Sequence, residues 1–218
     1  MAKRVFDIIV ASLALLAALP VLAAAALAIR LASPGPVLHR AARAGRDGRP
    51  FTMLKLRTMH VAPPGESGSR ITGAADPRVF PVGALLRRTK IDELPQLVNV
   101  LRGEMAIVGP RPEDPEIVRR HYSPAHRETL RVRPGLVSPG SIYHFTHGEA
   151  LLGGGDPETA YAARLLPVKL ELERVYVRHA SLGYDLALIA RAARAIIRVG
   201  LLRRSFPEPP ELRRIPAD

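Results

Sequence analysis

The chain has 218 residues, which is enough for one globular domain with a core of its own or for a domain with a membrane element. It contains no cysteine, which excludes disulfide bonds and any thiolate metal site or nucleophile. Its formal net charge of +12 at pH 7 predicts an acidic partner, which can be nucleic acid, anionic lipid headgroups or a substrate that carries phosphate.

An uncharged apolar segment covers residues 8–29, IIVASLALLAALPVLAAAALAI. As a helix it would be roughly 33 Å long at about 1.5 Å per residue, which matches the hydrocarbon thickness of a bilayer. The segment is too long for a cleaved signal peptide, and Asp7 stands at its start. We therefore expect the segment to remain in the protein and to meet the membrane.

Two membrane topologies fit this segment. The ring of Pro20 removes one backbone donor and clashes with the preceding turn, so we expect a kink or break near Leu19 and Pro20. Basic residues flank both ends, with Lys3 and Arg4 before the segment and Arg30 after it. Cations at both ends favour a helical hairpin that enters and leaves by the same face, because a spanning helix usually has its positive excess on one side. A simple spanning helix with a tolerated proline is the alternative.

Turn residues and a strand pattern follow. The run SPGP at 33–36 is expected to end the first helix, and PVLHRAAR at 36–43 predicts a short strand or an interfacial stretch. Apolar and polar residues alternate in FTMLKLRTM at 51–59, which predicts a strand. Residues 61–76 are rich in small, polar and helix-breaking residues, which predicts a mobile loop that could cover a site. A short helix is expected to follow it.

Two adjacent carboxylates, Asp92 and Glu93, precede Pro95. We place Asp92 at a helix N-cap, because a proline in the first turn costs no hydrogen bond. One apolar helical face then follows at Leu94, Leu97, Val98 and Leu101. Gly103 is expected to end this helix. At a helix start the free N–H groups favour negative charge, so an ionised Asp92 could act as a nucleophile or as a Mg²⁺ ligand. Ordinary helix capping is the alternative for an isolated Asp-Glu pair.

Cations surround this pair in the sequence. Arg87, Arg88 and Lys90 precede it, and Arg111 follows in a rigid Gly-Pro-Arg-Pro turn after a short apolar strand. Cations beside carboxylates lower the carboxylate pKa and can hold phosphate oxygens. The turn could therefore aim one guanidinium into a site, although a plain turn is the default for a single Pro-Arg-Pro.

These residues resemble the bacterial sugar transferases, the monotopic phosphoglycosyl transferase family. The resemblance rests on KRVFDIIVA with the Leu19-Pro20 pair, SPGPVLHRAARAGRDGRPFTMLKLRTM, ITGAADPRVFPVGALLRRTKIDELPQLVNVLRGEMAIVGPRPE and RVRPGL, which cover most of residues 3–136. It weakens beyond Gly135, where the family often continues with Thr-Gly and then Gln. Ala106 also stands where relatives commonly carry a serine. These departures leave the identity of the sugar open.

Members of this family transfer a sugar-1-phosphate from a nucleoside diphosphate sugar, usually a UDP-sugar, to undecaprenyl phosphate, and UMP leaves. The reaction starts the assembly of exopolysaccharide, of lipopolysaccharide O-antigen or of glycoprotein glycans. The resemblance implies that Asp92 is the catalytic nucleophile, that Glu93 assists it as a base or by organising the site, and that Mg²⁺ binds beside Asp92. It assigns phosphate binding to Arg87 and Arg111. Three further cations in matching motifs could line the donor site or be solvated or lipid-facing charges: Lys55, Arg57 and Arg78.

The resemblance also implies an architecture. We expect an α-rich α/β protein with a re-entrant helix-break-helix anchor at 1–32, a catalytic domain with short strands and interfacial amphipathic helices at 33–204, and a disordered tail at 205–218. The protein should lie at the cytoplasmic face of the inner membrane, in contact with anionic lipids. We expect no nucleic-acid partner, and a homodimer is possible. Residues 161–204 predict two helices. The second has an apolar and a basic face, so it either lies among lipid headgroups or packs on the core with its basic face solvated.

Two other classes of protein explain fewer features. A non-catalytic, membrane-tethered binder of anionic lipid or nucleic acid accounts for the charge and the apolar segment, but it gains nothing from two acids in a basic site. A polytopic sugar-phosphate transferase needs many spanning helices, and the sequence has one candidate segment. The seven histidines show no metal-ligand spacing, and the glycines at 153–155 predict a flexible loop.

Overall fold

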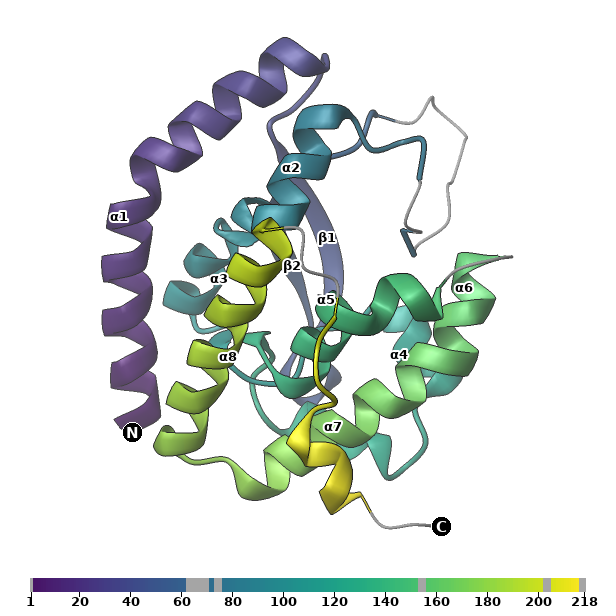
Figure 1. Cartoon of the computed structure of the whole chain (residues 1–218). Coiled ribbons are helices and arrows are strands. Elements are labelled where there is room, and N and C mark those ends of the chain that lie inside the picture. Colours follow the sequence, from purple (N-terminus) through teal and green to yellow (C-terminus); the bar gives the residue numbers. More distant parts are fainter. Residues whose placement is uncertain (1, 62–70, 73–75, 153–155, 202–204, 216–218) are drawn as a thin grey trace.

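The computed structural model describes residues 2–61, 71–72, 76–152, 156–201 and 205–215 (Figure 1). Most of the expected mobile loop at 61–76 and the glycines at 153–155 lie outside the described residues, so both remain predictions. The domain limits remain predictions as well.

The chain begins with one continuous helix, α1 (Ala2–Ala32), which includes Pro20. Its ribbon bends along its length but is not interrupted (Figure 1), so the helix continues through Pro20 without a break. Its buried side chains form one stripe at helical spacing: Asp7, Ala11, Ala18, Ala25 and Ile29. Among the described residues, α1 is the one helix that is long and apolar enough to cross a membrane.

Two small sheets follow α1. Strands β1 (Leu38–Ala44) and β2 (Pro50–Leu56) form an antiparallel hairpin in which Leu38 is opposite Leu56. Strand β2 confirms the strand predicted in the stretch 51–59. Strand β1 shows that the stretch 36–43, for which we expect a strand or an interfacial segment, forms a strand. Strands β3 (Ala106–Val108) and β4 (Gly135–Val137) pair in parallel. A Cβ on Gly135 would lie 2.1 Å from the backbone nitrogen of Gly109, so only glycine lets these two chain segments approach.

Helices make up most of the rest, which confirms a helix-rich α/β protein with few short strands. They are α2 (Pro81–Thr89), η2 (Ile91–Glu93), α3 (Gln96–Arg102), α4 (Pro115–His121), η3 (His126–Arg131), α5 (Pro139–Leu151), α6 (Pro157–Ala160), η4 (Tyr161–Leu165), α7 (Leu166–His179), α8 (Leu182–Gly200) and η5 (Pro210–Arg214), with η1 (Arg46–Gly48) in the β1–β2 turn. Gly103 ends α3 in a left-handed conformation with φ 83°, as the sequence predicts.

Helix α1 packs on the rest of the protein along both of its halves. Ala11 belongs to an apolar cluster with Val100 of α3 and Leu188 of α8. Further along, Ile29 packs in a second cluster with Leu86 of α2. Burial of apolar surface contributes a free energy of about 25 cal/mol per Å², and it holds both halves of α1 against the rest of the protein.

Polar contacts fix the start of α1. Arg4 donates hydrogen bonds to the carbonyl oxygens of Val100 (2.6 Å) and Leu101 (2.9 Å), in the last turn of α3. The buried Asp7 accepts a hydrogen bond from the backbone N–H of Ile107 at 3.0 Å. A cation on the last carbonyls of a helix is favoured by the helix dipole, so Arg4 also caps α3.

Helix α8 exposes part of its apolar surface. Leu182, Leu186 and Ile197 are each at least half exposed, whereas Leu188 is buried in the apolar cluster described above. On the other face, Arg191 pairs with Glu211 of η5, which also accepts a hydrogen bond from the hydroxyl of Tyr184 at 2.7 Å. This buried carboxylate holds a helical turn at 210–214, inside the segment for which we predict disorder.

Candidate active site

The two carboxylates lie in a tight turn before α3. Asp92 and Glu93 belong to η2, and the N-cap of α3 is Pro95, without a side-chain cap. The prediction that Asp92 caps α3 is therefore wrong. The helix starts later because the preceding turns are closed by i→i+3 hydrogen bonds, such as that from the N–H of Leu94 to the carbonyl of Ile91 at 3.2 Å.

Glu93 is the centre of a cluster of cations. Arg111 donates two hydrogen bonds to it, from Nη2 to Oε1 at 2.7 Å and from Nη1 to Oε2 at 3.1 Å. The ammonium groups of Lys55 and Lys90 each lie 3.3 Å from Oε1. Burial alone would raise the pKa of Glu93, but these three cations hold it well below its usual value. The Gly-Pro-Arg-Pro turn thus aims its guanidinium at the carboxylate pair, as the sequence suggests.

Asp92 has the opposite electrostatic environment. Only 5% of the residue is exposed, and Oδ1 has no hydrogen-bond partner among the described residues. Burial, and then the neighbouring charge of Glu93, raise the pKa of Asp92. The expectation that nearby cations lower the carboxylate pKa therefore holds for Glu93 and not for Asp92. One oxygen of Asp92 remains available for a ligand, because buried acceptors rarely lack a partner.

Lys55 and Arg87 also approach the pair. Lys55 extends from β2 toward Glu93, and burial lowers its pKa to about 8. Arg87, near the end of α2, donates a hydrogen bond from Nε to Oγ1 of Thr58 at 2.8 Å. Asp92 provides the strongest charge interaction of Arg87. The structure therefore brings together five residues that the sequence singles out: Lys55, Arg87, Asp92, Glu93 and Arg111.

Arg57 and Arg78 are held elsewhere. The buried guanidinium of Arg57 donates hydrogen bonds to the carbonyl (2.7 Å) and the hydroxyl (2.8 Å) of Ser33 and also bonds the carbonyl of Pro36, which fixes the turn after α1. Arg78 forms a two-pronged ion pair with Asp76, with Nε 2.9 Å from Oδ1 and Nη2 2.6 Å from Oδ2. Neither has a described contact with the carboxylate pair.

Arg111 is supported by a group of buried polar residues that the sequence does not predict. The backbone N–H of Arg111 donates to Oε1 of Glu173 in α7 at 3.2 Å, and the hydroxyl of Ser138 donates to the same oxygen at 2.6 Å. Burial raises the pKa of Glu173 to about 7. Beside it, Lys169 and the hydroxyl of Tyr161 both contact Glu113. Residues this far apart in the chain carry no spacing signal that would pair them.

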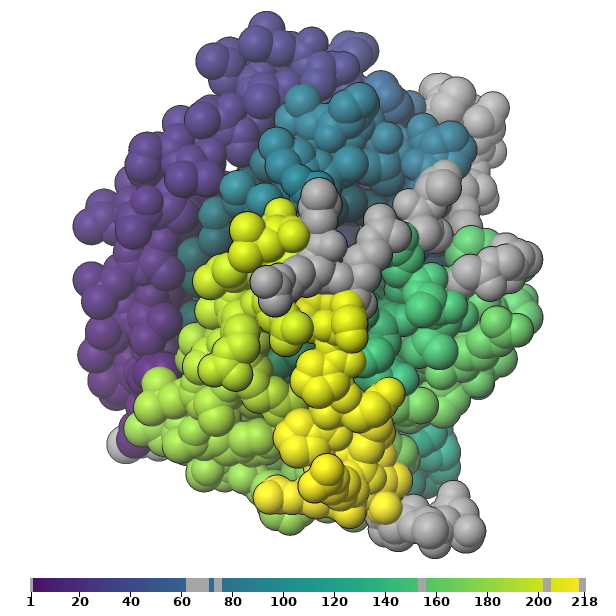
Figure 2. All heavy atoms as spheres, viewed as in Figure 1, coloured from purple at the N-terminus to yellow at the C-terminus, as the bar shows by residue number. Residues whose placement is uncertain are grey.

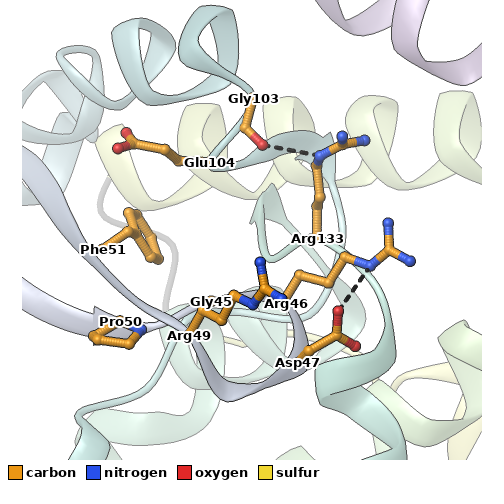
Figure 3. A pocket seen from close by; sticks show the side chains of 9 residues that line it. All are labelled: Gly45, Arg46, Asp47, Arg49, Pro50, Phe51, Gly103, Glu104 and Arg133. Atoms are coloured by element: carbon orange, nitrogen blue, oxygen red, sulfur yellow. Dashed lines mark hydrogen bonds and ion pairs between the residues drawn. The ribbon is translucent and has the colours of Figure 1, made fainter.

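A separate hollow lies at the other end of α3. It has a volume of about 400 Å³, and Arg133 donates a hydrogen bond at 2.9 Å from its Nε to the carbonyl of Gly103 in its wall (Figure 3). Its lining is Gly45, Arg46, Asp47, Arg49, Pro50, Phe51, Gly103, Glu104 and Arg133, which includes none of the predicted site residues. The carboxylate pair is thus separate from this hollow.

Comparison with known proteins identifies the family of the chain. A family model described as bacterial sugar transferase matches residues 1–199. The UDP-glucose:undecaprenyl-phosphate glucose-1-phosphate transferase of Caulobacter vibrioides is 38% identical over 200 residues, which are 89% of this chain and 69% of that protein. The Escherichia coli protein of the same name is 39% identical over 190 residues, which are 86% of this chain and 38% of that protein.

A third relative carries another sugar in its name. The putative undecaprenyl-phosphate N-acetylgalactosaminyl 1-phosphate transferase of Bacillus subtilis is 43% identical over 133 residues, which are 61% of this chain and 74% of that protein. The extent of the family match and the identity to the Caulobacter protein show that this chain belongs to the bacterial sugar transferase family.

Proposed function

We propose that the chain transfers a sugar-1-phosphate from a UDP-sugar to undecaprenyl phosphate through a covalent bond to Asp92, and releases UMP. The observation that carries this proposal is the pairing of two unlike carboxylates: Glu93 is neutralised by three cations, while Asp92 beside it keeps one oxygen without a hydrogen-bond partner among the described residues. The names of the Caulobacter and Escherichia coli relatives support the substrates.

The reaction proceeds in two displacements. An oxygen of Asp92 forms a bond to the phosphorus next to the sugar while the phosphoanhydride bond breaks, and UMP carries away the electron pair. A phosphate oxygen of undecaprenyl phosphate then attacks the same phosphorus, and the carboxylate of Asp92 leaves. A covalent intermediate avoids the direct attack of one phosphate anion on another and divides a slow transfer into two easier steps.

The surrounding cations have separate tasks. Charge accumulates on phosphoryl oxygens in each displacement, and fixed guanidinium and ammonium groups stabilise it without reorganising. Arg87, Lys55 and Lys90 stand next to the pair with hydrogen-bonding capacity left for phosphate. Glu93 is a weak base because its pKa is low, so we assign it to holding Arg111 and the lysines in place rather than to proton transfer.

The residues present fit one Mg²⁺ ion at Asp92. Among the described residues no group of three histidine, aspartate or glutamate side chains is arranged to hold a metal. Mg²⁺ usually takes one or two carboxylates and completes its shell with water and substrate phosphates, and the unbonded Oδ1 of Asp92 is such a ligand. When bound there, the ion would neutralise charge on the phosphates.

We infer that the protein lies in one leaflet at the cytoplasmic face of the inner membrane. Helices α1 and α8 lie on the same side of the molecule (Figure 2), and both carry exposed apolar side chains. Because α1 packs on α3 with one half and on α2 with the other, a perpendicular span would carry α2 into the bilayer. The basic chain would then meet anionic headgroups and the acceptor phosphate at the membrane surface.

The activity is tested with protein held in nanodiscs, Mg²⁺, undecaprenyl phosphate and a panel of UDP-sugars. We expect UMP release with at least one donor and a loss of at least about a thousandfold in Asp92→Asn. Mass spectrometry of protein quenched during turnover should find a sugar-phosphate adduct on Asp92. Asp47→Asn, at an exposed turn, is the matched control and should keep full activity. No release with any donor, with Asp92→Asn indistinguishable from the wild type, would favour the non-catalytic binder.

The topology is tested in the same chain, which has no native cysteine. Ala2→Cys and Asp47→Cys should both react with a membrane-impermeant maleimide applied from the cytoplasmic side. Labelling of the two positions from opposite sides would show that α1 spans the bilayer.

A further inference from the structure

Helix α5 brings an aromatic ring to the carboxylate pair. The ammonium of Lys90 lies 4.6 Å from the centre of the Phe145 ring and 3.3 Å from Oε1 of Glu93. One ammonium group therefore contacts both the ring and the carboxylate. Phe145 is therefore linked to the carboxylate pair through this cation.

The position of Lys90 is set by its backbone. Lys90 has φ 60° and ψ 13°, a left-handed conformation that is uncommon for a residue other than glycine. It joins α2 to η2, and its N–H bonds the carbonyl of Arg87 at 3.2 Å. Strained backbone of this kind persists where the surrounding structure requires it, and it is frequent at functional sites. Lys90 is therefore held beside Glu93 by the turn that joins α2 to η2.

His144, the neighbour of Phe145, contributes an uncharged polar group. Its ring lies 5.9 Å from that of Tyr161, centre to centre. Burial, and then the charges of Lys169, Arg111 and Lys90, hold the pKa of His144 well below its usual value. Neutral imidazole offers one hydrogen-bond donor and one acceptor.

We propose that α5 forms the sugar-binding wall of the donor site, with Phe145 packed against the carbon face of the sugar ring and His144 hydrogen-bonded to a sugar hydroxyl. This inference rests on the proposed function. The two sides of the site divide by chemistry: β2, α2 and the Gly-Pro-Arg-Pro turn supply cations for phosphates, whereas α5 supplies an apolar ring and a neutral hydrogen-bonding group. Sugars need the second set, because they carry hydroxyl groups and no charge.

Phe145 lies close to the carboxylate pair, and this favours contact of its ring with the sugar rather than with the uracil base. The phosphorus that Asp92 attacks is bonded to the sugar oxygen, so the sugar is the substituent nearest the pair. The uridine is separated from that phosphorus by a second phosphate. The ring of Phe145 is separated from Glu93 by the ammonium group of Lys90 alone, so it is placed to contact the sugar before the uridine.

The test measures kcat and KM for four donors, UDP-glucose, UDP-galactose and their N-acetylamino counterparts, with UDP as an inhibitor. In Phe145→Leu we expect KM for the best donor to rise about fivefold to tenfold, because an aromatic contact is worth about 1 kcal/mol. The differences in kcat/KM among the four donors should become smaller, while kcat for the best donor and the inhibition constant of UDP change less than twofold. Phe145→Tyr should remain close to the wild type, and His144→Ala should narrow the preference as well.

Phe206 is the matched control, since its ring also carries a cation, with Cζ of Arg198 5.4 Å from its centre. Phe206→Leu should leave every constant unchanged. If Phe145→Leu raises the inhibition constant of UDP as much as KM, the ring contacts the nucleotide and the inference is wrong. If the wild type is active and Phe145→Leu and His144→Ala keep its donor preference, the inference fails and the proposed function stands. Absence of UMP release by the wild type with every donor refutes both.

Discussion

Replacing Arg111 by methionine removes the guanidinium that donates two hydrogen bonds to Glu93, at 2.7 Å and 3.1 Å. Lys55 and Lys90 remain on Oε1, so the carboxylate keeps part of its compensation but loses every partner of Oε2 among the described residues. A hydrogen bond to a charged group contributes about 1.5–3 kcal/mol, and a buried carboxylate without its partner is costly. We expect a coupling of about 2–3 kcal/mol between the two side chains.

A double-mutant cycle measures this coupling. The free energies of unfolding of the wild type, Arg111→Met, Glu93→Gln and the double variant are obtained from guanidinium titrations in detergent, followed by circular dichroism. The control cycle uses Arg119 and Glu116, an ion pair on the exposed surface of α4, for which we expect a much smaller coupling. A coupling for Arg111 and Glu93 no larger than that of the control would show that solvent screens the pair. The buried cation cluster around Glu93 would then be refuted.

Three further predictions follow from the same contacts. Activity should fall as pH rises through about 8, where Lys55 loses its proton, and Lys55→Arg should move the fall to higher pH in a UMP-release profile; a fall at an unchanged pH would contradict this assignment. Glu173 has a folded pKa of about 7 against 4.5 unfolded, so the folded state binds more protons between these values and stability declines as pH rises; Glu173→Gln should flatten that decline in thermal melts taken from pH 4.5 to 7. Arg57→Met should lower the melting temperature without changing KM for the donor, because Arg57 donates hydrogen bonds to Ser33 in the turn after α1. A raised KM with an unchanged melting temperature would show instead that Arg57 contributes to the donor site.

The sequence predicts those parts of the fold that local chemistry determines. The alternation around Met53 predicts strand β2, and Gly103 ends α3 where a left-handed residue is needed. The short helix before the carboxylate pair also forms where it is expected, as α2. Each of these features depends on a few neighbouring residues, so the pattern alone is sufficient.

The parts that sequence reasoning missed depend on distant contacts. Asp92 is buried in a turn rather than placed at an open helix cap, and its surroundings include Lys55 and Arg87 from other elements. Glu173 reaches Arg111 across 62 positions, and no spacing rule links them. Arg57 lies in a motif shared with the family, yet only the path of the chain after α1 shows that Ser33 occupies its guanidinium.

The packing of α1 has a practical consequence for work with this protein. Its inward stripe covers Val100, Leu86 and their neighbours, so the helix is a wall of the folded protein as well as its proposed attachment to lipid. A shortened chain that begins after residue 32 would present this apolar surface to water and lose the cap that Arg4 places on α3. Solubilisation by truncation should therefore yield aggregates, and purification has to keep the whole helix in detergent or a lipid disc.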